Sequence, residues 1–214
     1  MEEIRLVFKR ISWLGCLSFI MACSPAKEKI SPAQQFYVAF QELPKQDTVY
    51  IGLDSVSMTT AKAVPFQRFF AATDAILQQN LIYQPDTLDG GLRALWKIPL
   101  KEGYDLCLME LRQAWFQFRY GLIYNRTDQQ FIQLEPIAYF YGGDGGQVFG
   151  ESWLINQQTL ISRETERSLQ WTENNEPEEL ISRQVSGQIW SATEFKTSTV
   201  SDSLYWMWRE PLYW

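Results

Sequence analysis

The chain has 214 residues, a length typical of one ordinary domain. Hydrophobic residues make up 46% and charged residues 21% of it, which is enough to bury a core and excludes the composition of a disordered protein. The absence of histidine excludes histidine-dependent triads and histidine metal ligands. The net charge is −6 without any basic tract, so we expect no nucleic-acid partner.

The amino terminus has the pattern of a secretory signal. Three basic residues within the first ten precede an apolar stretch over residues 11–22. Twelve residues are too few to span a bilayer about 30 Å thick, but they suit the apolar region of a signal peptide. The stretch ends in Ile20-Met21-Ala22-Cys23, with an aliphatic residue three places before the cysteine and a small residue directly before it. This ending resembles the lipobox of bacterial lipoproteins, over residues 1–23 only.

The resemblance implies that the leader is cut before Cys23 and that Cys23 is acylated on its sulfur and its new amine. Several acyl chains anchor a protein stably, whereas one chain binds a membrane only marginally. Ser24 is not the aspartate that retains such proteins at the inner membrane, which favours the outer membrane of the bacterial envelope. We therefore expect a signal peptide over residues 1–22, an acylated tether over 23–30 and one β-rich globular domain over 31–214.

A tripeptide of Asp, Ser or Thr, and an aliphatic residue recurs along the chain. It occurs at Asp47-Thr48-Val49, Asp54-Ser55-Val56, Asp86-Thr87-Leu88 and Asp202-Ser203-Leu204. Composition alone predicts roughly 0.4 occurrences, a comparison that any motif match requires. The tripeptide is similar to the acceptor site of a periplasmic O-glycosylation system of some Gram-negative bacteria, so the four hydroxyl residues are candidate acceptors. The structural alternative is that Asp-Ser/Thr ends a turn and the aliphatic residue opens a strand.

Two short helices are expected before residue 80. Ser31-Pro32 with Gln34 forms a capping box at the start of the first, and Pro44 follows its end. Residues 48–53 read as a strand. Pro65 starts the second helix, whose apolar residues recur at helical spacing and are expected in the core. They are Phe66, Phe69, Phe70, Ile76 and Leu77.

From residue 92 onward the apolar residues alternate with a period of two, which predicts seven or eight strands. The expected strands lie over 93–100, 104–112, 115–124, 129–141, 147–156, 160–171, 179–186 and 188–196, with Gly187 as a turn. Ala94 and Ile98 are expected on one face. In 115–124 the aromatic residues share one face, and Gln117, Arg119 and Gly121 share the other. The predicted fold is mainly β with one or two N-terminal helices (α+β), as an antiparallel meander forming a small barrel or sandwich.

One loop stands out as a candidate binding loop, Gly142-Gly143-Asp144-Gly145-Gly146. Its glycines permit close approach of a ligand or a strand. A phosphate loop would need a lysine and a following helix, and a calcium loop would need more acids than Asp144. A glycine-rich hairpin is therefore the alternative, and we expect neither a metal nor another cofactor.

Catalytic residues are not identifiable from the sequence. Glu110, Glu135 and Glu151 fall on neighbouring expected strands and would suit carboxylate-dependent hydrolysis if the fold paired them, although a solvated strand face explains them equally. Ser152 lacks the glycines of a nucleophile elbow. Cys107 lies in an apolar run and is expected to be buried.

Three functions remain open. The first is a non-catalytic binding or assembly module, anchored in the membrane by lipid, that serves an envelope protein partner. The second is a β-barrel carrier of a small apolar or glycan ligand, and the third is a hydrolase. A core filled by side chains would favour the module, whereas an apolar cavity of about 300 Å³ or more would favour the carrier.

Overall fold

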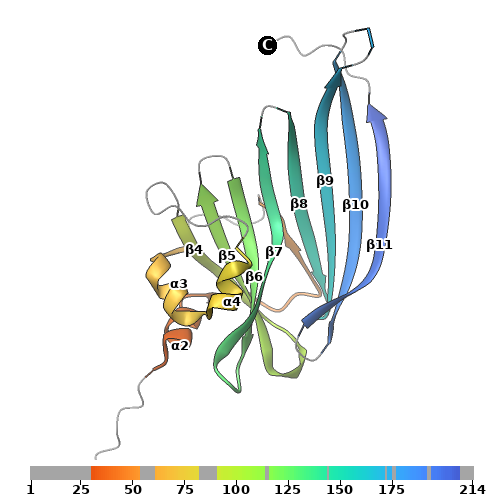
Figure 1. The fold of residues 1–214 in the computed structure, drawn as a ribbon. Helices are drawn as coiled ribbons and strands as arrows, with labels where there is room; N and C mark the ends of the chain where they lie inside the picture. Colours follow the sequence, from red (N-terminus) through yellow and green to blue (C-terminus); the bar gives the residue numbers. More distant parts are fainter. Residues whose placement is uncertain are drawn as a thin grey trace, which may run out of the picture. The chain divides into compact units, whose positions relative to one another are not determined.

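A computed structural model of the chain describes residues 30–53, 61–81, 91–113, 116–143, 145–171, 173–174, 177–191 and 194–207 (Figure 1). The helices are α2 (Pro32–Tyr37), α3 (Phe66–Ala72) and α4 (Ala75–Gln79), and a 3-10 turn spans Lys101–Gly103. The strands are β1 (Gln41–Glu42), β2 (Thr48–Ile51), β3 (Lys62–Val64), β4 (Gly91–Pro99), β5 (Tyr104–Gln113), β6 (Phe116–Asn125), β7 (Gln130–Gly143), β8 (Gly146–Ile155), β9 (Thr159–Trp171), β10 (Pro177–Ser191) and β11 (Glu194–Met207). None of the helices in this part of the chain has the length and apolarity that crossing a membrane requires.

Strands β4 to β11 form an antiparallel meander in which each strand pairs with the next one along the chain. The outer edge of β4 is occupied by β1, which is parallel to it, and by β3, which is antiparallel. Because that edge is taken, β4 does not pair with β11, and the sheet of described strands is not closed into a barrel. The β-rich α+β class and the meander are confirmed, whereas the barrel form of closure is wrong.

The sheet divides into two layers between β7 and β8. Residues 139–143 of β7 pair with 146–150 of β8, but residues 152–155 of β8 pair with β2 instead. The side chain of Ser152 is fully buried at this division and donates a hydrogen bond of 2.6 Å to the carbonyl of Ile137 on β7. The serine is therefore a structural link between the layers rather than an exposed nucleophile.

A hydrophobic cluster fills the space between the layers. It joins β2, β8 and β9 on one side to β4, β5 and β6 on the other. Its members include Val49, Ile51, Leu95, Ile98, Leu106, Leu108, Ile123, Leu154 and Leu160. The polar face expected for β6 is covered by this layer, so Arg119 is buried rather than solvated.

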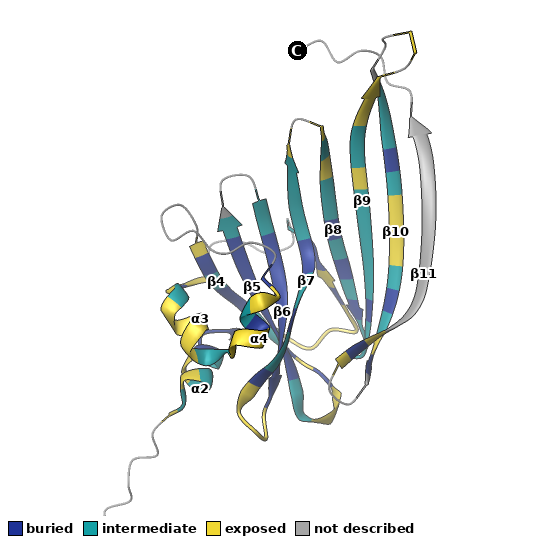
Figure 2. Ribbon diagram, in the orientation of Figure 1, coloured by how far each residue is buried: buried dark blue, intermediate teal, exposed yellow. Residues whose placement is uncertain are grey.

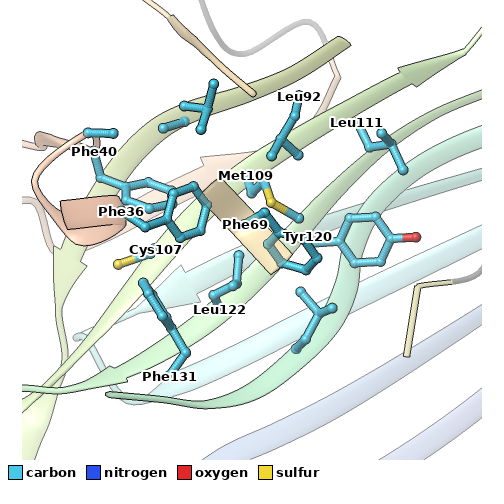
Figure 3. Close-up of a cluster of buried hydrophobic side chains, with 14 of the residues drawn as sticks. Phe36, Phe40, Phe69, Leu92, Cys107, Met109, Leu111, Tyr120, Leu122 and Phe131 are labelled. Carbon is cyan, nitrogen blue, oxygen red and sulfur yellow. The ribbon is translucent and has the colours of Figure 1, made fainter. Parts of the chain in front are cut away.

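The three helices cover the other face of β4–β7 (Figure 1). Ser31 accepts a hydrogen bond from the amide of Gln34, whose side chain accepts one from the amide of Ser31, so the predicted capping box is confirmed. The rings of Phe36 and Phe69 then meet edge to face, with centroids 6.0 Å apart. Figure 3 shows both rings over the side chains of β5 and β6, among them Met109.

Strand β5 is buried on both faces, as Figure 2 shows along its central part. Cys107 and Met109 belong to the cluster under the helices, whereas Leu106 and Leu108 belong to the cluster between the layers. A strand covered on both sides has a continuous apolar sequence instead of an alternating one. The predicted burial of Cys107 is confirmed, and it is a free cysteine.

Some expectations for individual residues are wrong. The second helix is interrupted, because the Asp74 carboxylate caps a new helix, α4, by accepting from the amide of Leu77. Ile76, which follows the break, is 73% exposed, and Phe70, which lies within α3, is 38% exposed. A register irregularity in β4 between residues 94 and 97 sends Ala94 to one core and Ile98 to the other.

Gly187 is not a turn. It lies inside β10, opposite Ile161 of β9 and Thr199 of β11. The register of β10 against β11 shifts directly after it, between Gly187 and Gln188. The extra residue of this β-bulge lies on β11, between Thr197 and Thr199, and the pairing of β10 with β9 continues unbroken through Gly187.

Candidate functional site

A groove of about 530 Å³ lies on one face of β7–β10, bordered by the end of β2. It lies on the face that carries Phe149 and Glu151, which alternate along β8 with Ser152 and Leu154 of the opposite, buried face. Its lining includes the side chains of Tyr50, Phe140, Phe149, Arg163, Thr165 and Arg167. We call this surface the groove.

The groove is positively charged in an acidic protein. Arg163, Arg167 and Arg183 line it against one acid, Glu151, so its lining has a net charge of +2. The whole chain has a net charge of −6. The groove is therefore positively charged although the whole protein is negatively charged, and it attracts negatively charged groups.

Aromatic rings hold two of the arginines. The Arg167 guanidinium lies 5.6 Å from the ring centroid of Phe149, and the Arg163 guanidinium lies 5.2 Å from that of Trp153. Phe149 packs in turn against Phe140 at 5.0 Å. Such cation–π contacts hold the flat face of a guanidinium and do not use its N–H groups.

The acid in the groove positions its neighbours. Arg163 donates through Nε to the Glu151 carboxylate at 2.7 Å, and its Nη2 donates to the same oxygen. The other carboxylate oxygen accepts a 2.7 Å hydrogen bond from the hydroxyl of Tyr50. Tyr50 reaches it because its ring lies over Gly52, where a Cβ would collide with the tyrosine oxygen.

A buried ion pair fixes the end of β2 at the edge of the groove. Arg119 is 0% exposed and Glu110 is 2% exposed, with Nε and Oε2 3.3 Å apart. The Arg119 guanidinium also donates to the carbonyls of Gly52 and Leu53, the latter at 2.6 Å. Gln117 donates to the same glutamate at 3.0 Å. Each charged group is thus paired and hydrogen-bonded, as burial requires.

A second, smaller cavity of about 170 Å³ opens on the other face of β9 and β10. Its lining is polar and contains Glu135, Glu164, Ser162, Gln184 and Ser186. The hydroxyl of Tyr139 donates a hydrogen bond to Glu164, and burial, reinforced by that bond, raises the pKa of Tyr139. Burial also raises the pKa of Glu135, against the opposing effect of a hydrogen bond from Gln133.

The three carboxylates singled out in the sequence have different environments. Glu110 is committed to Arg119 inside the protein. Glu135 and Glu151 both border the smaller cavity, but the Glu151 carboxylate is held by Arg163 and Tyr50. The structure therefore does not present them as a pair of free carboxylates.

The candidate binding loop closes the hairpin between β7 and β8. Gly143 of β7 pairs with Gly146 of β8, and Gly145 lies in the turn between them, whereas Asp144 falls outside the described residues. A Cβ at Gly142 would come within 2.7 Å of the Gly146 carbonyl oxygen. The close approach of the two strands thus requires glycine here, and a role in binding stays a prediction.

Two of the other candidate residues lie in the part of the chain that the structure describes, and three lie outside it. Thr48 is exposed as the first residue of β2, and Ser203 lies in β11 opposite Arg183. Cys23, Ser55 and Thr87 fall outside the described residues. Lipidation and glycosylation of these positions stay predictions.

Sequence reasoning missed the arginine groove, although one signal for it was present. Arg163, Thr165 and Arg167 alternate along β9 with Glu164 and Glu166, which places positive and negative charge on opposite faces of one strand. Within the described residues, His, Cys, Asp and Glu side chains do not gather in threes that could hold a metal ion. No protein-family model, curated protein or solved structure matches the chain.

Proposed function

We propose that the chain is a lipid-anchored, non-catalytic binding module of a bacterial cell envelope, and that the groove is its binding surface. The observation that carries the binding role is the cluster of Arg163, Arg167 and Arg183 beside aromatic rings in a groove of about 530 Å³. That volume is in the range of small-molecule sites, and a few convergent polar groups beside apolar walls are typical of them.

The anchor is supported by the lipobox resemblance of residues 1–23. The filled interior supports a module over a barrel carrier, because side chains occupy both faces of the central strands and the described sheet is open. The large cavity is a charged surface groove rather than an apolar interior chamber. A hydrolase is less well supported, because Arg119 and Arg163 engage the carboxylates of Glu110 and Glu151, two of the three candidate acids.

The anchor is tested by expressing the full chain in a Gram-negative host supplied with labelled palmitate. We expect label in the membrane fraction, its loss in Cys23→Ser, and its retention in the control Cys107→Ala. Label that persists in Cys23→Ser, or a wild-type protein found outside the membrane fraction, would refute the lipid anchor.

The binding role is tested by native mass spectrometry of the full-length protein, solubilised from the envelope in detergent. We expect a non-covalent adduct that is lost on denaturation and absent from Thr165→Trp, which fills the groove. Gln170→Trp is the matched control, because Gln170 is exposed on the same strand and does not line the groove. An adduct of protein size would identify an envelope partner, and an adduct unchanged in Thr165→Trp would show that the groove is not the binding surface.

A further inference from the structure

We infer that the groove takes the oxyanion of a small organic ligand, a carboxylate or a phosphate ester, among the guanidinium groups of Arg163, Arg167 and Arg183. This inference rests on the proposed function of the groove as the binding surface, and it names the chemistry of the ligand.

The strand register places Thr165 at the centre of the three arginines. Arg163 and Arg167 lie two residues before and after it on the same face of β9, and Arg183 of β10 lies directly opposite it. Phe149 lies opposite it on the other side, on β8. Diagonal neighbours in a sheet have Cα atoms about 7–8 Å apart, so Arg183 is within side-chain reach of both other arginines. Like charges at this separation repel one another unless an anion lies between them.

Among the described residues that line the groove, Glu151 is the carboxylate. Glu151 pairs with Arg163, and Glu164 and Glu166 alternate with the arginines and so point to the opposite face of β9. For Arg167, the contact found within the described part of the chain is with the ring of Phe149. Its Nε is buried and has no hydrogen-bond partner there. A buried donor without a partner is costly, and a ligand oxygen would supply the partner.

The geometry of guanidinium explains why the ligand group is an oxyanion. Nε–H and a neighbouring Nη–H of arginine form a fork that fits the two oxygens of a carboxylate or a phosphate. A rotation of the Arg167 guanidinium over Phe149 would present both N–H groups to the groove. The volume of about 530 Å³ far exceeds the space for a lone ion, so the oxyanion belongs to an organic molecule.

A substitution at the centre of the cluster tests the charge without any ligand. Thr165→Glu places a carboxylate among the three arginines, and Thr165→Gln is its neutral match in size. At low ionic strength we expect the glutamate variant to melt about 2–4 °C above the glutamine variant, a shift that corresponds to about 1 kcal/mol in a domain of this size. The difference should shrink in 1 M NaCl. Equal melting temperatures, or a lower one for Thr165→Glu, would overturn the inference.

A ligand series then tests binding with the full-length protein in detergent. The probes are glucuronate, glucose 6-phosphate and uncharged glucose, compared at equal ionic strength by the shift in melting temperature. We expect a shift with at least one of the two anions and none with glucose. The shift should disappear in Thr165→Glu and in Arg167→Gln, and persist in Arg68→Gln, a control arginine exposed on α3.

The outcomes separate the ligand chemistry from the binding role. A shift with only one anion would identify the carboxylate or the phosphate as the recognised group. No shift with either anion, or a shift that survives in Arg167→Gln, would overturn the oxyanion assignment. If an uncharged adduct from the envelope is nevertheless displaced by Thr165→Trp, the groove remains the binding surface and only its ligand chemistry is wrong.

Discussion

The ring of Tyr139 lies against Gly150, its partner across the β7–β8 pair. A Cβ at Gly150 would come within 2.5 Å of the tyrosine ring, so the side chain needs a glycine beneath it. The hydroxyl extends beyond the glycine to Glu164 on β9, and Tyr139 thereby spans three strands. It also borders both the groove and the smaller cavity, as Gly150, Glu151 and Arg163 do.

Replacing Gly150 by alanine should destabilise the protein. The new methyl group must displace a ring that is held at its far end, and overpacking of this kind costs about 1–3 kcal/mol. The free energy of unfolding, measured in urea, checks the prediction. Gly143→Ala is the matched control, because a Cβ at Gly143 meets nothing within 4 Å. Equal stabilities of the two variants would contradict the packing described for Tyr139.

Replacing Arg119 by glutamine should be more damaging. Glu110 would then lie inside the protein without its main partner, and breaking a buried ion pair costs about 3–5 kcal/mol. Arg112 lies 3.7 Å from the same glutamate but is 44% exposed, so Arg112→Gln should cost at most about 1 kcal/mol. Urea unfolding of both variants measures the difference. A mild effect of Arg119→Gln would show that water reaches Glu110.

The stability of the protein should depend on the charge of Glu135. Burial raises its pKa in the folded state above the ordinary value of 4.5, so the folded protein binds a proton more tightly than the unfolded chain. This contribution to stability is present below pH 4.5 and is lost as the pH rises through the folded pKa. We expect Glu135→Gln to raise the melting temperature at pH 7 relative to its effect at about pH 4. Gln170→Ala, at an exposed position, is the control because it changes no titratable group.

The number of reactive thiols should show whether Cys107 is buried and whether the leader has been removed and Cys23 acylated. The sequence contains three cysteines, of which Cys16 leaves with the leader and Cys23 is acylated if the lipobox is used. Cys107 is buried, and its burial raises its pKa, so it should not react with a thiol reagent in the folded protein. We expect zero reactive thiols in the native mature protein and one in guanidinium chloride. Three thiols after denaturation would indicate an unprocessed chain.

The strands and their buried faces were largely predictable, because the alternation that defines them is local. Phe118, Tyr120 and Leu122 share one buried face, as their spacing predicts. The burial of Arg119 was not predictable from its neighbours, because it depends on a second layer formed by strands β2 and β8. A polar residue within an alternating strand has the same sequence signature whether water or another layer covers it.

The candidate site was predictable only in fragments. The alternation of charges around Thr165 is visible in the sequence. The position of Thr165 between Phe149 and Arg183, however, depends on the register of three strands. The glycines of residues 142–146 stand out in the sequence and close a hairpin. The loop can therefore be identified from the sequence by its glycine content, whereas the groove depends on the pairing between strands.

The pairing of β2 with β8 has a consequence for how the protein folds. Tyr50 and Glu151 are 101 residues apart in the sequence, whereas β5, β6 and β7 are joined by short turns. Contacts between distant residues form late, because the loss of chain entropy precedes the gain from the contact. We therefore expect the central hairpins to form first and β2 to dock afterwards. This wall of the groove is then the last part of the molecule to form, and a chain arrested before that step would be almost fully folded yet would lack the proposed binding surface.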